Sequence, residues 1–97
     1  MAGYSLSAKA ASDLEAIYEY TILRFGLDQA RVYLLGLHEQ CQILADQPAR
    51  GRQADVLAPG LRRWEYHSHI IFYVPREHGI RIVRVLHQRM DVRRHVP

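Results

Sequence analysis

The sequence is short of cysteine, lysine and long apolar runs, and each shortage excludes a class of protein. The single cysteine, Cys41, allows neither an internal disulfide nor a cysteine-based zinc site, which fits a reducing compartment. No apolar run approaches the roughly 20 residues that cross a bilayer. The N-terminus also lacks a basic-then-apolar signal peptide. We therefore expect a cytoplasmic protein without a membrane partner.

Lysine is almost absent, because all but one of the 13 basic residues are arginine. Arginine forms planar, bidentate contacts with carboxylates and phosphates, so this bias favours specific interfaces over a diffuse positive coat. Residues 1–60 carry five basic and seven acidic side chains, whereas residues 61–97 carry eight basic and three acidic ones. The positive C-terminal third predicts an acidic partner: nucleic acid, an acidic protein segment or a nucleic-acid enzyme.

The length of 97 residues fits a single domain over residues 1–97, and its first half contains two apolar stripes at helical spacing. Ser7 is expected to cap the first helix, although Ser12 and Glu15 form a competing capping box. Gly26 should end this helix, and Asp28 should cap the second, which Pro48 stops. The stripes consist of Leu14, Ile17, Tyr18, Thr21, Ile22 and Phe25, and of Ala30, Tyr33, Leu34, Leu37, Cys41 and Leu44.

From residue 61 the apolar spacing drops to two, which predicts a meander of three antiparallel strands. The expected strands are Leu61–Tyr66, Ile70–Val74 and Ile80–Leu86, preceded by an edge strand near Tyr4–Leu6 and a loop over residues 48–60. The predicted fold is α+β in the order β-α-α-β-β-β, with a helical hairpin on one face of a small, mainly antiparallel sheet. One face of the last strand is expected to carry Ile80, Ile82, Arg84 and Leu86.

Arginines on two of these strands are the first candidate site. If the strands are neighbours, Arg62, Arg63, Arg81 and Arg84 converge on the uncovered sheet face as a phosphate or carboxylate site. The alternative is a set of solvated charges paired with acidic residues such as Glu65.

Histidine and aromatic residues give weaker signals. His67 and His69 lack a third ligand nearby, so we predict no metal and no cofactor. His87 suits a general acid or base, or a strand-end histidine bonded to backbone. The aromatic residues among the arginines suit either base stacking or core and interface contacts: Trp64, Tyr66 and Tyr73.

Nearly the whole chain resembles the ParE branch of the ParE/RelE superfamily of bacterial toxins, through short pieces in matching order and spacing. The last block, Val83–Asp91 followed by Arg94 and His95, is the most specific. The other pieces are Tyr4–Ser7, Ala11–Leu14, Tyr20, Thr21, Phe25, Gly26, Gln29, Ala30, Pro48, Gly51, Arg52, Gly60–Arg62, Tyr66, Ser68, His69, Phe72 and Tyr73.

The resemblance implies a toxin that inhibits DNA gyrase, blocks replication and growth, and is neutralised by a ParD-like antitoxin. Such a pair stabilises the plasmid or chromosome that carries it. The toxin is then a protein inhibitor with no catalytic residues, and it has no sequence-specific DNA binding of its own. The gyrase-binding residues are expected among the strand arginines and the tail: Arg62, Arg63, Arg81, Arg84, His87, Arg89, Met90, Asp91 and Arg94.

The RelE branch of the superfamily supplies the alternative, a ribosome-dependent mRNA endoribonuclease. In that case Arg62, Arg81 and Arg84 would stabilise the phosphate charge and His87 would transfer a proton. The tail has no tyrosine and the 48–60 loop has no lysine, which departs from the RelE pattern.

Both hypotheses predict an antitoxin partner and an accessible tail. The expected antitoxin-binding residues are the apolar positions beside the helical stripes and two strand aromatics: Val32, Leu35, Ile43, Trp64 and Tyr73. The residues after the last strand are expected to project from the sheet, so deletion of Arg89–Pro97 should spare folding more than toxicity.

Overall fold

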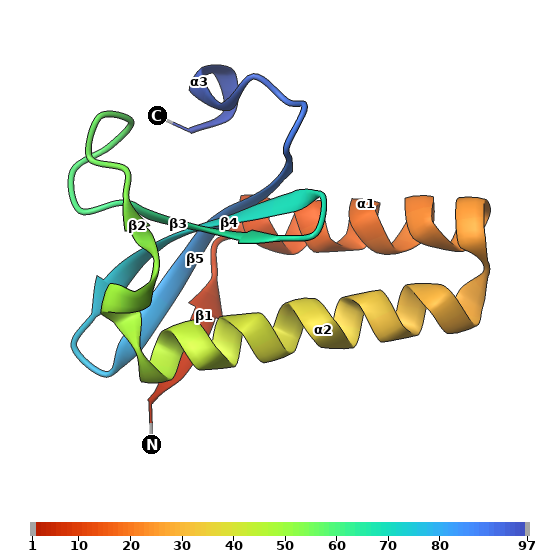
Figure 1. Cartoon of the computed structure of the whole chain (residues 1–97), viewed down its shortest axis with the longest axis horizontal. Helices are drawn as coiled ribbons and strands as arrows, with labels where there is room; N and C mark the ends of the chain where they lie inside the picture. The colour runs from red at the N-terminus through yellow and green to blue at the C-terminus, as the bar shows by residue number, and fades with distance from the viewer. Residues whose placement is uncertain (1, 97) are drawn as a thin grey trace.

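The computed structural model describes residues 2–96, in which five strands form one sheet and two long helices lie against it (Figure 1). The sheet order is β1-β5-β4-β3-β2, with β1 parallel to β5 and every other pair antiparallel. This confirms the predicted α+β fold. The elements are β1 (Gly3–Leu6), α1 (Ala8–Phe25), α2 (Leu27–Asp46), the 3₁₀ turn η1 (Pro48–Arg50), β2 (Arg52–Gln53), β3 (Arg62–Tyr66), β4 (His69–Arg76), β5 (Gly79–His87) and α3 (Val92–His95).

The start of α1 is fixed by Ser7, as predicted. Its Oγ accepts a hydrogen bond from the Ala10 N–H at 2.9 Å and donates to the Val83 carbonyl at 2.7 Å, so the cap also ties the helix to β5. At the other end, Gly26 alone separates the two helices, because its φ of 91° reverses the chain in one residue. The prediction that Asp28 caps α2 is therefore wrong, and Asp28 lies inside the first turn.

The main core lies between the helical hairpin and one face of the sheet. The two predicted stripes supply Leu14 from α1 and Leu37, Cys41 and Leu44 from α2, all buried. Burial raises the pKa of the Cys41 thiol to about 12, so this residue behaves as a small core hydrophobe, as predicted. The sheet supplies Ile71, Tyr73, Ile80, Ile82 and Val85.

The opposite face of the sheet was expected to be open, but it carries a second core. Leu61, Phe72 and Leu86 are almost fully buried there, beneath the 54–61 loop and the C-terminal segment. Val96 is only 4% exposed, and Val92 packs against the same cluster. Figure 1 shows α3 folded back above the strands. The tail therefore packs on the sheet and does not simply project. Deletion of Arg89–Pro97 would uncover this core and so destabilise the fold. That the deletion spares folding more than toxicity stays a prediction.

The last strand does not alternate as predicted. Tyr73 pairs with Ile82 and Phe72 pairs with Arg84, so Val83 is an extra residue at a β-bulge. Beyond the bulge the side chains change faces. Leu86 consequently packs in the second core, whereas Ile80 and Ile82 pack under the helices.

The strand boundaries also shift. Pro75 and Arg76 extend β4, although they were expected in the hairpin loop, and the 48–60 loop contains η1 and β2. The α1–α2 end of the hairpin extends past the strands (Figure 1). Neither long helix combines the length and hydrophobicity needed to cross a membrane, for the residues that the structure describes.

The second core predicts that the tail stabilises the fold. Val96→Ala should lower the free energy of unfolding by about 2 kcal/mol, because it removes two buried methyl groups. Val56→Ala is the matched control, since Val56 is 90% exposed, and should change it by less than about 0.5 kcal/mol. Urea denaturation followed by circular dichroism measures both. Equal stabilities would show that Val96 does not contribute to the core.

Candidate functional site

Arg84, a predicted target-binding residue, forms a structural junction with Asp13 of α1. Its Nε and Nη2 donate to the two Asp13 carboxylate oxygens, each at 2.8 Å, and only 14% and 13% of the two side chains is exposed. The Val85 N–H donates to the same carboxylate at 3.0 Å, and Arg84 Nη1 donates to the His95 carbonyl at 3.0 Å. The hydrogen bond to Asp13 raises the pKa of Arg84. The guanidinium thus joins α1, β5 and the C-terminal segment.

The other strand arginines do not gather around Arg84. Arg62 Nη1 donates to the Gly51 carbonyl at 2.6 Å, and Arg81 Nη1 lies 3.4 Å from Ser5 Oγ near β1. Arg81 and His87 stand six residues apart on β5, which is about 20 Å along a strand. The residues proposed for the ribonuclease alternative are therefore not brought together as one catalytic set.

His87 and Met90 instead line a cleft between the projecting helices and the end of the sheet, which we call the hairpin groove. It encloses about 730 Å³. Most of its wall is apolar or aromatic, and its floor is the end of β4 and β5. Its lining residues are Asp13, Ala16, Ile17, Tyr20, Thr21, Phe25, Gln29, Tyr33, His67, Ser68, His69, Val85, His87 and Met90.

A pair of histidines forms the polar part of this groove. His69 pairs with His87 across β4 and β5, and their rings meet edge to face with centroids 5.3 Å apart. His69 Nδ1 lies 2.6 Å from the Tyr33 hydroxyl, and His87 Nδ1 accepts the Arg89 N–H at 3.1 Å. Burial, and secondly charge on His87, lowers the pKa of His69 to about 4. His69 is therefore neutral at pH 7.

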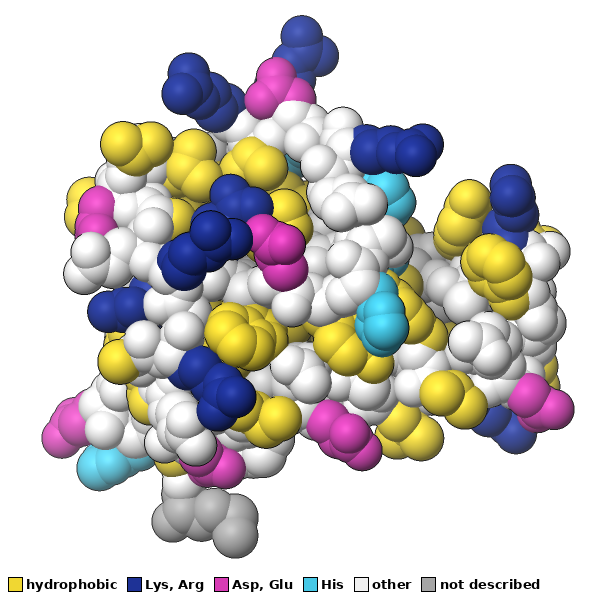
Figure 2. All heavy atoms as spheres, viewed as in Figure 1, with side chains coloured by type: hydrophobic (Ala, Val, Ile, Leu, Met, Phe, Trp, Pro, Cys, Tyr) yellow, Lys and Arg dark blue, Asp and Glu magenta, His cyan; other side chains and the backbone are white. Residues whose placement is uncertain are grey.

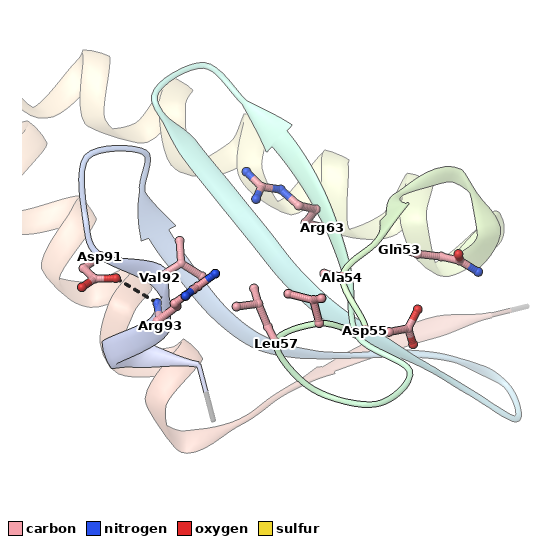
Figure 3. Close-up of a pocket in the computed structure, with 9 residues that line it drawn as sticks. Gln53, Ala54, Asp55, Leu57, Arg63, Asp91, Val92 and Arg93 are labelled. Carbon is pink, nitrogen blue, oxygen red and sulfur yellow. Dashed lines mark hydrogen bonds between the residues drawn. The ribbon is translucent and has the colours of Figure 1, made fainter.

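A second cleft, the tail crevice, lies on the other sheet face between the 53–57 loop and residues 91–93 (Figure 3). It encloses about 570 Å³ and includes two predicted target-binding residues, Arg63 and Asp91. Asp91 accepts the Arg93 N–H at 3.2 Å and so caps α3. The Arg63 guanidinium lies over the Phe72 ring at 5.7 Å, and its Nε is buried without a hydrogen-bond partner in the described residues.

The arginines of the tail are exposed, and one of them, Arg94, directly follows a residue that lines the tail crevice. Arg94 pairs loosely with Asp91 at 3.6 Å, with 82% of the arginine side chain exposed. Arg89 is exposed as well. In Figure 2, Lys and Arg side chains are concentrated over the strands and the C-terminal segment, whereas the projecting end of the hairpin shows several apolar side chains. Some basic side chains also lie on the hairpin, such as Arg24 over the Tyr20 ring, and apolar side chains lie among the basic ones over the strands (Figure 2).

The predicted antitoxin-binding residues divide into exposed and buried ones. Val32 and Leu35 are 64% and 63% exposed on the outer side of α2, and Ile43 is 37% exposed. Trp64 is half-buried and donates from Nε1 to Gln40 at 2.8 Å.

Tyr73 offers no surface at all, because it is fully buried. Its hydroxyl accepts the Gly51 N–H at 2.9 Å and donates to the Pro48 carbonyl at 2.8 Å. Tyr73 therefore holds the end of α2 against the sheet, and its assignment to an antitoxin-binding surface is corrected.

The hairpin groove was not predicted from the sequence. His69 was considered only as a weak metal ligand beside His67, and Tyr33 only as part of an apolar stripe. The available signal was the two-residue turn at residues 67–68, which fixes the pairing of Tyr66 with His69. Placing His87 beside His69 also requires the register of β5, which the sequence alone does not reveal.

Comparison with known proteins identifies close relatives over nearly the full chain. Residues 4–92 match the family model described as the ParE toxin of the type II toxin–antitoxin system parDE. A protein named Toxin ParE1 from Mycobacterium tuberculosis is 45% identical over 94 residues, 96% of each chain. Toxin ParE1 from Caulobacter vibrioides is 38% identical over 98 residues, 99% of each chain.

A solved structure shows the same fold. A chain of the chromosomal ParDE system from P. aeruginosa superposes with a TM-score of 0.76, covering 90% of this chain and 96% of its own. Its sequence identity of 24% restricts that comparison to the fold.

The Asp13–Arg84 junction predicts a strong coupling between two residues distant in sequence. Asp13→Ala should lower the free energy of unfolding by about 3 kcal/mol, because it leaves a mostly buried guanidinium unpaired. Glu65→Ala breaks the exposed pair with Arg52 and should cost less than about 1 kcal/mol. A double-mutant cycle with Arg84→Ala, measured by urea denaturation, gives the coupling directly. Additive effects at the two positions would contradict this account.

Proposed function

Because this chain belongs to the ParE toxin family of type II toxin–antitoxin systems, we propose that it inhibits DNA gyrase and is neutralised by a ParD-like antitoxin. The observation that carries the proposal is the match to the ParE family model over residues 4–92. Inhibition of gyrase blocks DNA replication, so free toxin arrests growth until antitoxin binds it.

The proposed toxin is a protein inhibitor and makes or breaks no bond itself. General acid–base cleavage of RNA needs a proton-transfer group within hydrogen-bond reach of the reacting atoms and cationic groups around the phosphate. Arg84 is neutralised by Asp13, and Arg81 lies far along β5 from His87. These positions favour binding over catalysis, and the proposed activity requires no cofactor.

The surface proposed for gyrase is the tail crevice together with the exposed tail residues beside it. Arg63, Asp91 and Arg94 lie on this side of the sheet, and Arg89 precedes them in the tail. Exposed arginines suit the acidic patches and phosphates of an enzyme–DNA complex. Four other residues that were predicted to bind gyrase lie on other parts of the surface: Arg62, Arg81, His87 and Met90.

The surface proposed for the antitoxin is the outer side of α2 together with the hairpin groove. Val32 and Leu35 expose large apolar side chains one helical turn apart, and Ile43 continues the same side. Exposed apolar groups in a row mark a docking surface for a partner segment that folds on binding.

Gyrase inhibition is tested with the purified protein in a DNA supercoiling assay. The wild-type protein should inhibit supercoiling or stabilise cleaved DNA. The double variant Arg89→Glu, Arg94→Glu should need at least about tenfold more protein, because charge reversal weakens electrostatic docking.

The control carries the same charge change elsewhere, in Lys9→Glu with Arg76→Glu. These residues are exposed near the start of α1 and at the end of β4, so this variant should inhibit like the wild type. If the wild-type protein leaves gyrase unaffected, the proposed target is wrong. If only the control loses activity, the docking surface is not the tail.

Antitoxin binding is tested with the product of the adjoining reading frame. Val32→Ala with Leu35→Ala should weaken the complex at least about tenfold, because two exposed anchors are truncated. Leu23→Ala removes a leucine that is 86% exposed on α1 and should leave the affinity unchanged. Calorimetric titration measures all three affinities. An unchanged affinity in the double variant would remove this part of α2 from the interface.

A further inference from the structure

The hairpin groove combines apolar walls with an uncompensated histidine pair. Tyr20 is 58% exposed and Phe25 is 66% exposed at its outer end, and Met90 is 46% exposed at its inner end. Large apolar side chains from a partner can therefore be buried there. The polar floor of the groove, formed by His69 and His87, is accessible from the same cleft.

Asp13 is the sole carboxylate among the residues that line the groove, and its charge is already paired with Arg84. Both of its oxygens accept hydrogen bonds from Arg84, and one of them also accepts the Val85 N–H. The remaining groups that face His69 are neutral or cationic. They are Tyr33 from α2, Tyr66 and His67 from β3 and its turn, and His87 from β5, with Arg89 beyond it.

This arrangement leaves a protonated imidazole without a counter-ion. Charge on one histidine opposes charge on the other, since their ring centroids are 5.3 Å apart. An anion placed between the two rings would instead favour protonation, because it stabilises the charged form of each histidine. A partner carboxylate is the group that the groove lacks.

We propose that the His69–His87 pair anchors a carboxylate of the antitoxin in the hairpin groove, and that binding is therefore coupled to proton uptake. The occupant is an Asp or Glu side chain flanked by large apolar residues, which fill the walls on either side. In the bound state one imidazole takes a proton from solvent and pairs with the carboxylate. The inference rests on the proposed function, because it presupposes that an antitoxin binds.

The charge distribution around the groove favours this occupant. The Arg24 guanidinium lies over the Tyr20 ring at 5.8 Å at the outer rim. Arg89 is exposed, and its backbone N–H donates to His87 Nδ1 in the groove. These positive charges favour further acidic residues on the same segment.

The test measures antitoxin affinity by calorimetric titration between pH 6 and pH 8, using this full chain and the product of the adjoining reading frame. For the wild type, affinity should rise as pH falls, by up to tenfold per pH unit for one linked proton. In the double variant His69→Gln, His87→Gln, the affinity should change by less than twofold per pH unit. His78→Gln is the control, because His78 lies exposed in the β4–β5 turn, and should behave like the wild type.

A second measurement on the unmodified protein avoids any effect of the substitutions on folding. NMR titration of the histidine ring protons, in the free protein and in the complex, should show the pKa of His69 rising when the antitoxin binds. Equal pH dependence in the wild type and the double variant, with no pKa rise, overturns the inference and leaves antitoxin binding intact. Failure to form any complex overturns the proposed antitoxin as well. Self-association through the groove would assign it to a second copy of this chain and overturn the antitoxin as its occupant.

Discussion

The carboxylate of Asp13 joins α1 to β5 and, through Arg84, to the C-terminal segment. Residues of these three elements line the hairpin groove and the tail crevice. β1 stops pairing with β5 at Leu6 and Ile82, so the edge of β5 would be open beyond that point. Ser7 and Asp13 close it by binding the backbone of Val83 and Val85. Through Arg84, the same carboxylate also holds the C-terminal segment, because the guanidinium binds the His95 carbonyl. The groove and the crevice both depend on this position of β5.

The sequence reveals those features that local patterns determine. The helical stripes predict the main core, and Ser7 predicts the start of α1, because capping and periodicity depend on near neighbours. Arg84 looks like a free cation in the sequence, since its partner Asp13 is 71 residues away. The bulge at Val83 and the meeting of His69 with His87 depend on strand register. The second core escaped prediction because its tail residues, such as Val96, have no periodic pattern.

The two proposed surfaces lie on opposite faces of the sheet but adjoin at one point in the chain. Met90 lines the hairpin groove and Asp91 lines the tail crevice. A partner that fills the groove therefore contacts the residue next to the crevice. If the antitoxin fills the groove as proposed, neutralisation would need no long-range conformational change, because the two surfaces meet at adjacent residues.

The pairing of β1 with β5 has a consequence for synthesis on the ribosome. Gly3 pairs with Gly79, and Asp13 binds Arg84, so β1 and the start of α1 leave the ribosome long before their partners in β5. The helical hairpin must leave the exit tunnel with its apolar stripes uncovered by any sheet. Native structure can then form only after β5 has been synthesised, since these long-range contacts are the slow ones to close. A truncated nascent chain would therefore be an aggregation hazard and not a partly active toxin.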